Sequence, residues 1–219
     1  MNNSVKNMYC ISGLGADERA FERLNVNGCS LCYLEWIAPK PNENLTSYAG
    51  RMLSQIAEED PVILGLSFGG IIAIEIAKQI AVKKLILVSS VKTYNEIPRW
   101  MRIAGTLSLH KLIPIRSNRI TEKADDRRMG IETAEEKNFV DSYRKKADPK
   151  YVDWAVDQIL NWKNFWVPDN AFHIHGEKDR MFPLRNIQPT HVIKNGTHIM
   201  ILNKADEVSA CIEEIVLHL

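Results

Sequence analysis

The sequence predicts an α/β fold: a doubly wound, mostly parallel sheet with helices on both faces. Segments typical of strands alternate along the chain with segments typical of helices, which is the pattern of parallel strands joined by crossover helices. The run Val62, Ile63 and Leu64 is apolar without alternation, as expected for a central strand buried on both faces. With 219 residues, 45% of them hydrophobic and 25% charged, the chain is long enough for one domain with a sizeable core.

The first ninety residues divide into strand and helix signals in order. The expected strands are apolar or rich in β-branched residues, and they cover 8–11, 31–37, 62–64 and 84–90. The expected helices place apolar side chains at helical spacing: one begins near Asp17, a good N-cap, one covers 45–57, and one covers 69–77.

Residues 92–166 have a different character, with charge runs, helical periodicity and several tryptophans but no strand signal. Strand signals resume at 171–175 and 191–193, and a last amphipathic helix covers about 205–217. We therefore expect a core domain formed by residues 1–91 and 167–219, and a helical cap formed by residues 92–166. The cap is expected over the carboxyl ends of the strands, where sheets of this kind bind ligands.

A G-x-S-x-G element, Gly65 to Gly69, lies between a predicted buried strand and a helix of small and apolar residues. A sharp strand-to-helix turn leaves no room for side chains beside its apex, and the two glycines supply that room. Ser67 would then be exposed to a substrate as a nucleophile. The motif alone leaves open a glycine-rich turn whose serine has no function.

A serine hydroxyl needs a base to take its proton and a third group to hold that base. The sequence offers both at the ends of later strands, because Asp179 follows the strand at 171–175 and His198 follows the strand at 191–193. The order serine, acid, histidine is the one that a G-x-S-x-G element requires on such a sheet. Glu177 is an alternative acid in the same loop.

On three motifs, Gly65-x-Ser67-x-Gly69, His175-Gly176-x-x-Asp179 and Gly196-Thr197-His198, the chain resembles the α/β-hydrolase fold superfamily. The resemblance covers residues 8–90 and 170–217. It implies that Ser67 attacks an acyl carbonyl, that His198 is the general base and then the general acid, and that Asp179 orients His198.

The resemblance also implies an oxyanion hole made of two backbone N–H groups. One belongs to Phe68, the residue after the nucleophile, and the other to Leu14 in the loop after the first strand. Two features depart from the family: Ser12 precedes Gly13 where many relatives have His-Gly, and the usual amino-terminal hairpin is missing. The second departure predicts a small sheet of about six strands.

The cap segment carries the residues expected to bind substrate, which are tryptophans in it or at its edge: Trp100, Trp154, Trp162 and Trp166. They would either line an apolar pocket over Ser67 or hold the cap on the core. A basic stretch in the cap is interpreted as a solvated face rather than an anion site; it comprises Arg116, Arg119, Lys123, Arg127 and Arg128.

The sequence thus predicts a serine hydrolase, carboxylesterase-like, that cleaves a small or medium ester or thioester through an acyl-enzyme and needs no cofactor. A lyase, a ligand-binding relative or a C–C bond hydrolase remains an alternative, because fold does not determine function. A dehalogenase with an aspartate nucleophile is disfavoured, since position 67 is serine.

Other functions find little support in the composition and motifs. The net charge of +1 does not favour nucleic acid as a partner. No stretch has the ~18 apolar residues of a membrane span and no signal peptide is apparent, so a cytoplasmic location is expected. Cys29 and Cys32 lie in a predicted strand without a second cysteine pair, and His173 and His175 lack nearby metal ligands, so we expect no metal site. Gly13-Leu14-Gly15 lacks the third glycine of a dinucleotide loop.

Overall fold

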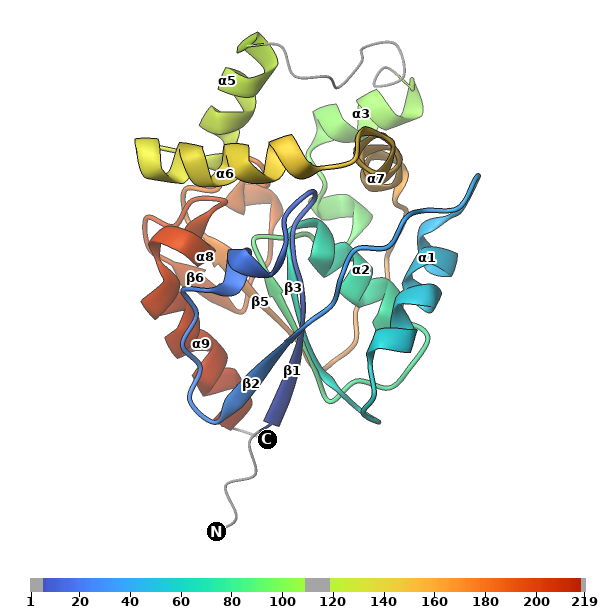
Figure 1. Cartoon of the computed structure of the whole chain (residues 1–219), viewed down its shortest axis with the longest axis vertical. Helices are drawn as coiled ribbons and strands as arrows, with labels where there is room; N and C mark the ends of the chain where they lie inside the picture. The colour runs from blue at the N-terminus through green and yellow to red at the C-terminus, as the bar shows by residue number, and fades with distance from the viewer. Residues whose placement is uncertain (1–5, 109–118, 218–219) are drawn as a thin grey trace.

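Six parallel strands form one sheet in the computed structural model, which describes residues 6–108 and 119–217 (Figure 1). The strand order is β2-β1-β3-β4-β5-β6, and every neighbouring pair is parallel. The strands are β1 (Lys6–Ile11), β2 (Cys29–Tyr33), β3 (Val62–Leu66), β4 (Lys84–Val88), β5 (Ala171–Gly176) and β6 (His191–Ile193). The predicted doubly wound sheet is confirmed, and its winding reverses between β1 and β3.

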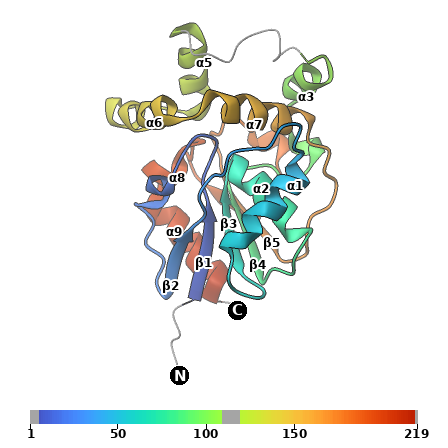
Figure 2. The ribbon, with the colours of Figure 1, turned by 45° about the vertical axis from the view of Figure 1, so that its right-hand side comes forward.

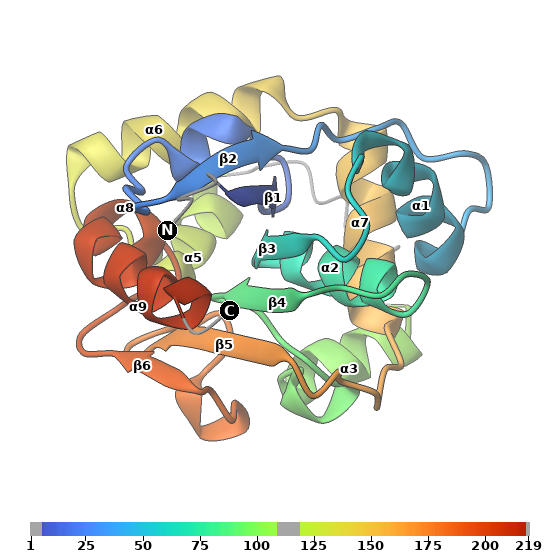
Figure 3. The ribbon, with the colours of Figure 1, turned by 90° about the horizontal axis from the view of Figure 1, so that it is seen from below.

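Helices cover both faces of the sheet (Figure 3). One face carries α1 (Leu45–Met52) and α2 (Phe68–Ala77), and the other carries α8 (Met200–Asn203) and α9 (Ala205–Leu217). Neighbouring residues of β3 alternate between two separate apolar cores: Ile63 packs with α1 and α2, whereas Val62 and Leu64 pack with α9. Two-sided burial explains why this strand is apolar without alternation.

Among the described residues between β4 and β5, four α-helices lie over the carboxyl ends of the strands, and we call them the cap helices (Figures 1 and 2). They are α3 (Arg99–Thr106), α5 (Arg119–Met129), α6 (Ala134–Lys146) and α7 (Pro149–Asn161). Thr133 and Glu136 form a capping box at the start of α6, and Asp148 caps α7 before Pro149. Of the basic stretch, Lys123 and Arg127 are exposed, and Arg116 lies outside the described residues.

The two ends of the cap segment meet beside the sheet. The side-chain amide of Asn164 donates to the carbonyl oxygens of Lys92 (2.7 Å) and Trp166 (2.6 Å), and the backbone N–H of Tyr94 donates to the carbonyl oxygen of Asn164 (2.7 Å). The indole N–H of Trp162 donates to a carboxylate oxygen of Glu75 on α2 at 2.8 Å. These bonds join the two ends of the cap segment to each other and fasten its base to α2.

Local structure differs from the sequence prediction near Asp17 and in α1. The helix expected near Asp17 is a four-residue 3-10 turn. The Leu24 N–H still donates to the carbonyl oxygen of Phe21, and beyond it the N–H groups of Asn25 and Asn27 donate to Ser209 Oγ and Glu213 Oε1 on α9. The helix expected over 45–57 ends at Met52 and passes into a second 3-10 turn. The 3-10 turns are Glu18–Phe21, Leu53–Gln55, Tyr94–Glu96 and Leu184–Asn186.

Candidate active site

Ser67 occupies the turn between β3 and α2 with strained backbone angles, φ 52° and ψ −116°. A non-glycine residue adopts such angles only when its surroundings impose them. Here the backbone N–H of Ser67 donates to the carbonyl oxygen of Val88 (2.9 Å), and the Ser90 hydroxyl donates to the carbonyl oxygen of Ser67 (2.7 Å). Both bonds come from β4 and the loop after it, and they hold the half-buried Ser67 at the carboxyl edge of the sheet.

The glycines on either side of Ser67 have no space for a side chain. A Cβ at Gly65 would lie 2.5 Å from the Cα of Gly70, and a Cβ at Gly69 would lie 2.2 Å from the carbonyl oxygen of Ile11. The neighbouring atoms are backbone and cannot rotate away. The G-x-S-x-G spacing therefore lets α2 start directly against β3 and the end of β1.

We expect Gly69→Ala to lower the free energy of unfolding by about 3 kcal/mol, since overpacking against fixed backbone is at the upper end of such costs. Urea unfolding measures the change. Gly28→Ala is the control, because no heavy atom lies within 4 Å of its Cβ position, although its φ of +74° alone costs about 1 kcal/mol. Equal losses in the two variants would contradict the steric explanation.

The three side chains predicted to act together lie in one hydrogen-bonded line. Ser67 Oγ is 3.0 Å from His198 Nε2, and His198 Nδ1 is 2.8 Å from Asp179 Oδ2. A carboxylate only accepts, so Nδ1 carries the ring proton and Nε2 accepts from the Ser67 hydroxyl. Asp179 and His198 are almost fully buried, whereas Ser67 keeps part of its surface exposed.

The Asp179 carboxylate is oriented by its own loop. Its Oδ1 accepts the backbone N–H groups of Met181 and Phe182, both at 2.8 Å, which leaves Oδ2 for His198. The ring of Phe182 packs edge-on against the imidazole of His198 at 5.5 Å. The alternative acid Glu177 is exposed, and it accepts the backbone N–H of Asn195 at 2.9 Å. The structure thus brings Asp179, and not Glu177, to the histidine.

His173 and His175 are fully buried below this loop, with their rings 5.1 Å apart. His175 Nε2 donates to the carbonyl oxygen of Phe182 at 2.8 Å, which supports the turn that holds Asp179. Burial lowers the pKa of both histidines, and that of His173 the further, so both are neutral near pH 7. Within residues 6–108 and 119–217, no group of three or more His, Cys, Asp or Glu side chains is placed to hold a metal ion.

The loop after β1 passes beside the nucleophile. The Cβ position of Gly13 is 3.6 Å from the Cβ of Ser67, and the Ala16 N–H donates to the carbonyl oxygen of Gly13 at 3.0 Å to close a turn around Leu14. Phe68 is the first residue of α2, so its N–H has no acceptor within the helix. Leu14 and Phe68 thus lie on the two segments that flank Ser67.

The four predicted tryptophans lie in different environments. Trp154 on α7 lies 6.3 Å from the ring of Phe68 and donates its indole N–H to the carbonyl oxygen of Glu43. Trp162 is buried at the base of the cap, and its indole bonds to Glu75. Trp100 and Trp166 are nearly half exposed, at 49% and 44%. Of the four, only Trp154 has a ring contact with the residue next to the nucleophile.

Sequence reasoning missed other aromatic residues at this place. Trp36 stacks on Phe68 with ring centres 5.5 Å apart, and Tyr151 of α7 packs on Trp36 at 5.4 Å. Tyr48 lies 4.4 Å from Trp154. β2 ends at Tyr33, so Trp36 lies beyond its carboxyl end, at the same edge of the sheet as Ser67. The strand expected over 31–37 included Trp36, and that expectation concealed its place at this edge. We call Trp36, Tyr48, Phe68, Tyr151 and Trp154 the aromatic cluster.

No family model and no curated protein matches the sequence. Solved structures do match the fold. The chain is similar to MenH from S. aureus (15% identity, TM-score 0.72, 98% of this chain and 94% of that chain) and to the esterase EaEST from Exiguobacterium antarcticum (17%, 0.67, 97% and 92%). It is also similar to CumD, a meta-cleavage product hydrolase (15%, 0.69, 98% and 92%).

The similarity extends over nearly the whole length of these proteins, all of which have the α/β-hydrolase fold. None of the helices in the described part of the chain is long and apolar enough to span a membrane. Together, the six parallel strands, the flanking helices and the structural matches show that this chain has the α/β-hydrolase fold.

Proposed function

We propose that the chain is a serine hydrolase that cleaves a small or medium carboxylic ester or thioester through an acyl-enzyme. The observation that carries the proposal is the line of contacts from Ser67 Oγ through His198 to Asp179, at 3.0 and 2.8 Å. A serine hydroxyl is activated when a base lies within hydrogen-bond reach of it and a buried carboxylate holds that base in place.

In the proposed acylation step, Ser67 Oγ bonds to the carbonyl carbon while its proton passes to His198 Nε2. The negative charge that develops on the carbonyl oxygen is stabilised by the backbone N–H groups of Leu14 and Phe68, a kind of contact worth ~3–4 kcal/mol per donor. The bond to the leaving alcohol or thiol then breaks, and His198 gives the proton to the departing atom.

Deacylation repeats the sequence with water. His198 Nε2 takes a proton from water as its oxygen bonds to the acyl carbon, and the bond to Ser67 Oγ breaks with return of the proton to the serine. Asp179 stabilises the imidazolium in both steps and keeps the ring proton on Nδ1. An apolar acyl or alcohol group would suit the two members of the aromatic cluster that are partly exposed, Trp36 and Trp154. We also propose that residues 92–166 form a separate cap domain, whose described helices lie over the carboxyl ends of the strands.

A fluorophosphonate probe tests the proposal together with a panel of nitrophenyl esters of increasing acyl length. We expect the probe to label Ser67, as located by peptide mass, and the folded chain to hydrolyse the shorter esters. Heat-denatured chain is the control, because labelling of an activated serine requires the folded site. Absence of both labelling and ester turnover would contradict the proposal and favour the lyase, ligand-binding or C–C hydrolase alternatives.

A further inference from the structure

We propose that Trp36 is a positioning residue that holds both backbone donors of the oxyanion hole in place. The inference rests on the proposed function, since it concerns the same tetrahedral intermediate. Trp36 follows β2, and within the described part of the chain its side chain forms no hydrogen bond with Ser67 or His198. Its side chain nevertheless contacts both segments that carry the donors, Leu14 on one side and Phe68 on the other.

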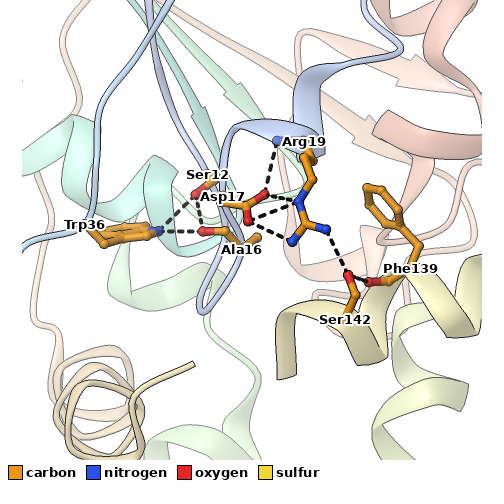
Figure 4. Close-up of polar contacts among 7 residues, drawn as sticks. All are labelled: Ser12, Ala16, Asp17, Arg19, Trp36, Phe139 and Ser142. Atoms are coloured by element: carbon orange, nitrogen blue, oxygen red, sulfur yellow. Dashed lines mark hydrogen bonds and ion pairs between the residues drawn. The ribbon is translucent and has the colours of Figure 1, made fainter. Parts of the chain in front are cut away.

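The indole N–H of Trp36 hydrogen-bonds to both ends of the loop that carries Leu14 (Figure 4). It is 2.9 Å from Ser12 Oγ and 3.1 Å from the carbonyl oxygen of Ala16, and it is directed to both acceptors. The Ser12 hydroxyl in turn donates to the same Ala16 carbonyl at 2.8 Å. Three groups therefore close a ring of hydrogen bonds between Ser12 and Ala16, and Leu14 stands midway between these two residues in the sequence.

The glycines of this loop explain why the backbone around Leu14 requires support from contacts outside the loop. Leu14 stands between Gly13 and Gly15, and Gly15 has a φ of +71°, so the backbone beside the proposed donor has unusual freedom. An oxyanion donor is effective only if it is already aimed at the developing charge, since reorientation during the reaction costs part of its benefit. The Trp36–Ser12–Ala16 bonds remove that freedom before substrate binds.

The ring of Trp36 acts on the second donor. It stacks on the side chain of Phe68 at 5.5 Å with an angle of 16° between the planes. Phe68 itself is 1% exposed, so its side chain is fixed, and with it the first turn of α2. One side chain thus links the loop after β1 to the start of α2, the two segments that carry the proposed N–H donors.

The far end of the loop is held independently of Trp36. The guanidinium of Arg19 pairs with Asp17 (2.7 Å) and donates to the hydroxyl of Ser142 on α6 at 3.3 Å (Figure 4). Arg19 also lies over the ring of Tyr143 at 4.6 Å. Residues after Ala16 are therefore anchored to the cap, and loss of the Trp36 bonds should disturb the Leu14 segment rather than unfold it.

Trp36→Phe is the decisive variant, because it keeps an aromatic ring against Phe68 and removes the indole N–H together with the five-membered ring that carries it. We expect kcat for an ester substrate to fall about 10-fold with KM changed less than about twofold, since the contact matters in the transition state and not in the ground state. The thermal unfolding midpoint should remain close to that of the wild type.

A thionoester separates positioning from general damage. Its sulfur accepts hydrogen bonds weakly, so the oxyanion hole stabilises its transition state only slightly even in the wild type. Trp36→Phe should therefore reduce turnover of the oxygen ester several-fold more than turnover of the matched thionoester. A structural defect would reduce both equally.

Gln55→Ala is the matched control. The side chain of Gln55 bonds to the backbone N–H (2.8 Å) and carbonyl (3.0 Å) of Glu35, next to Trp36, and neither bond involves the loop after β1. Ser12→Ala removes the other member of the ring of bonds, and together with Trp36→Phe it should cost less than the product of the two single effects.

Wild-type kcat in Trp36→Phe, or an equal loss with the thionoester, would overturn the inference and leave the proposed function standing. So would a loss in Gln55→Ala as large as that in Trp36→Phe. A wild-type chain that hydrolyses no ester would overturn the proposed function and the inference with it.

Discussion

Ser67→Ala is expected to reduce kcat for the best ester of the panel by about 10⁶-fold, close to the background set by binding and the oxyanion hole. The hydroxyl is the atom that would form the covalent bond, and alanine leaves His198 Nε2 with nothing to deprotonate in the acylation step. Ser67 Oγ bonds only to His198 among the described residues, so the fold should be unchanged. Steady-state kinetics at saturating ester measure the loss.

Two further measurements show whether the loss is chemical. Substrate binding by the variant, followed by quenching of tryptophan fluorescence, should stay within a few-fold of the wild-type affinity, and fluorophosphonate labelling at this position should vanish. Ser67→Cys should keep the covalent route at a reduced rate, because a thiolate is also a nucleophile. Turnover by Ser67→Ala within tenfold of the wild type would mean that water or another group attacks the substrate.

The sheet was predictable because its signals are local. Apolar runs, such as 62–64 and 84–90, predict strands that are buried on both faces. Polar residues directly after such runs indicate the edge of the sheet where the carboxyl ends of parallel strands lie together. That edge brings Ser67, Asp179 and His198 near one another, since Ser67 comes directly after β3 and the other two lie in the segments that follow β5 and β6. Their hydrogen bonds depend in addition on the conformation of those two segments.

The surroundings of the site were less predictable, because they depend on how separate segments cross. Trp162 and Trp154 lie on or beside the same helix, yet one faces Glu75 at the base of the cap and the other faces Phe68. Helical spacing does not say which surface a helix will cover. Trp36 was missed for the same reason: it lies in an irregular stretch after β2, and only the tertiary structure reveals its contacts with Ser12 and Phe68.

Asp179→Asn is expected to lower kcat about 10⁴-fold, although it changes one oxygen to a nitrogen. The amide keeps one acceptor, and that oxygen must stay at the Oδ1 position, where the N–H groups of Met181 and Phe182 both donate. The NH₂ group then faces His198 Nδ1, which has to accept. The ring proton moves to Nε2, and an N–H directed at Ser67 cannot take the proton of its hydroxyl.

Since the Asn variant replaces a carboxylate in an unchanged set of backbone bonds, KM and the unfolding midpoint should stay near the wild-type values while kcat and the rate of fluorophosphonate labelling fall together. Glu177→Gln is the matched control, two residues earlier in the same loop; it makes the same chemical change at an exposed carboxylate that bonds to Asn195. Its activity should remain within about twofold of the wild type, as is usual for an exposed side chain away from the chemistry. The opposite pattern, with the larger loss in Glu177→Gln, would mean that the histidine is held by a different acid during turnover and that the 2.8 Å contact of Asp179 is not the one that catalysis uses.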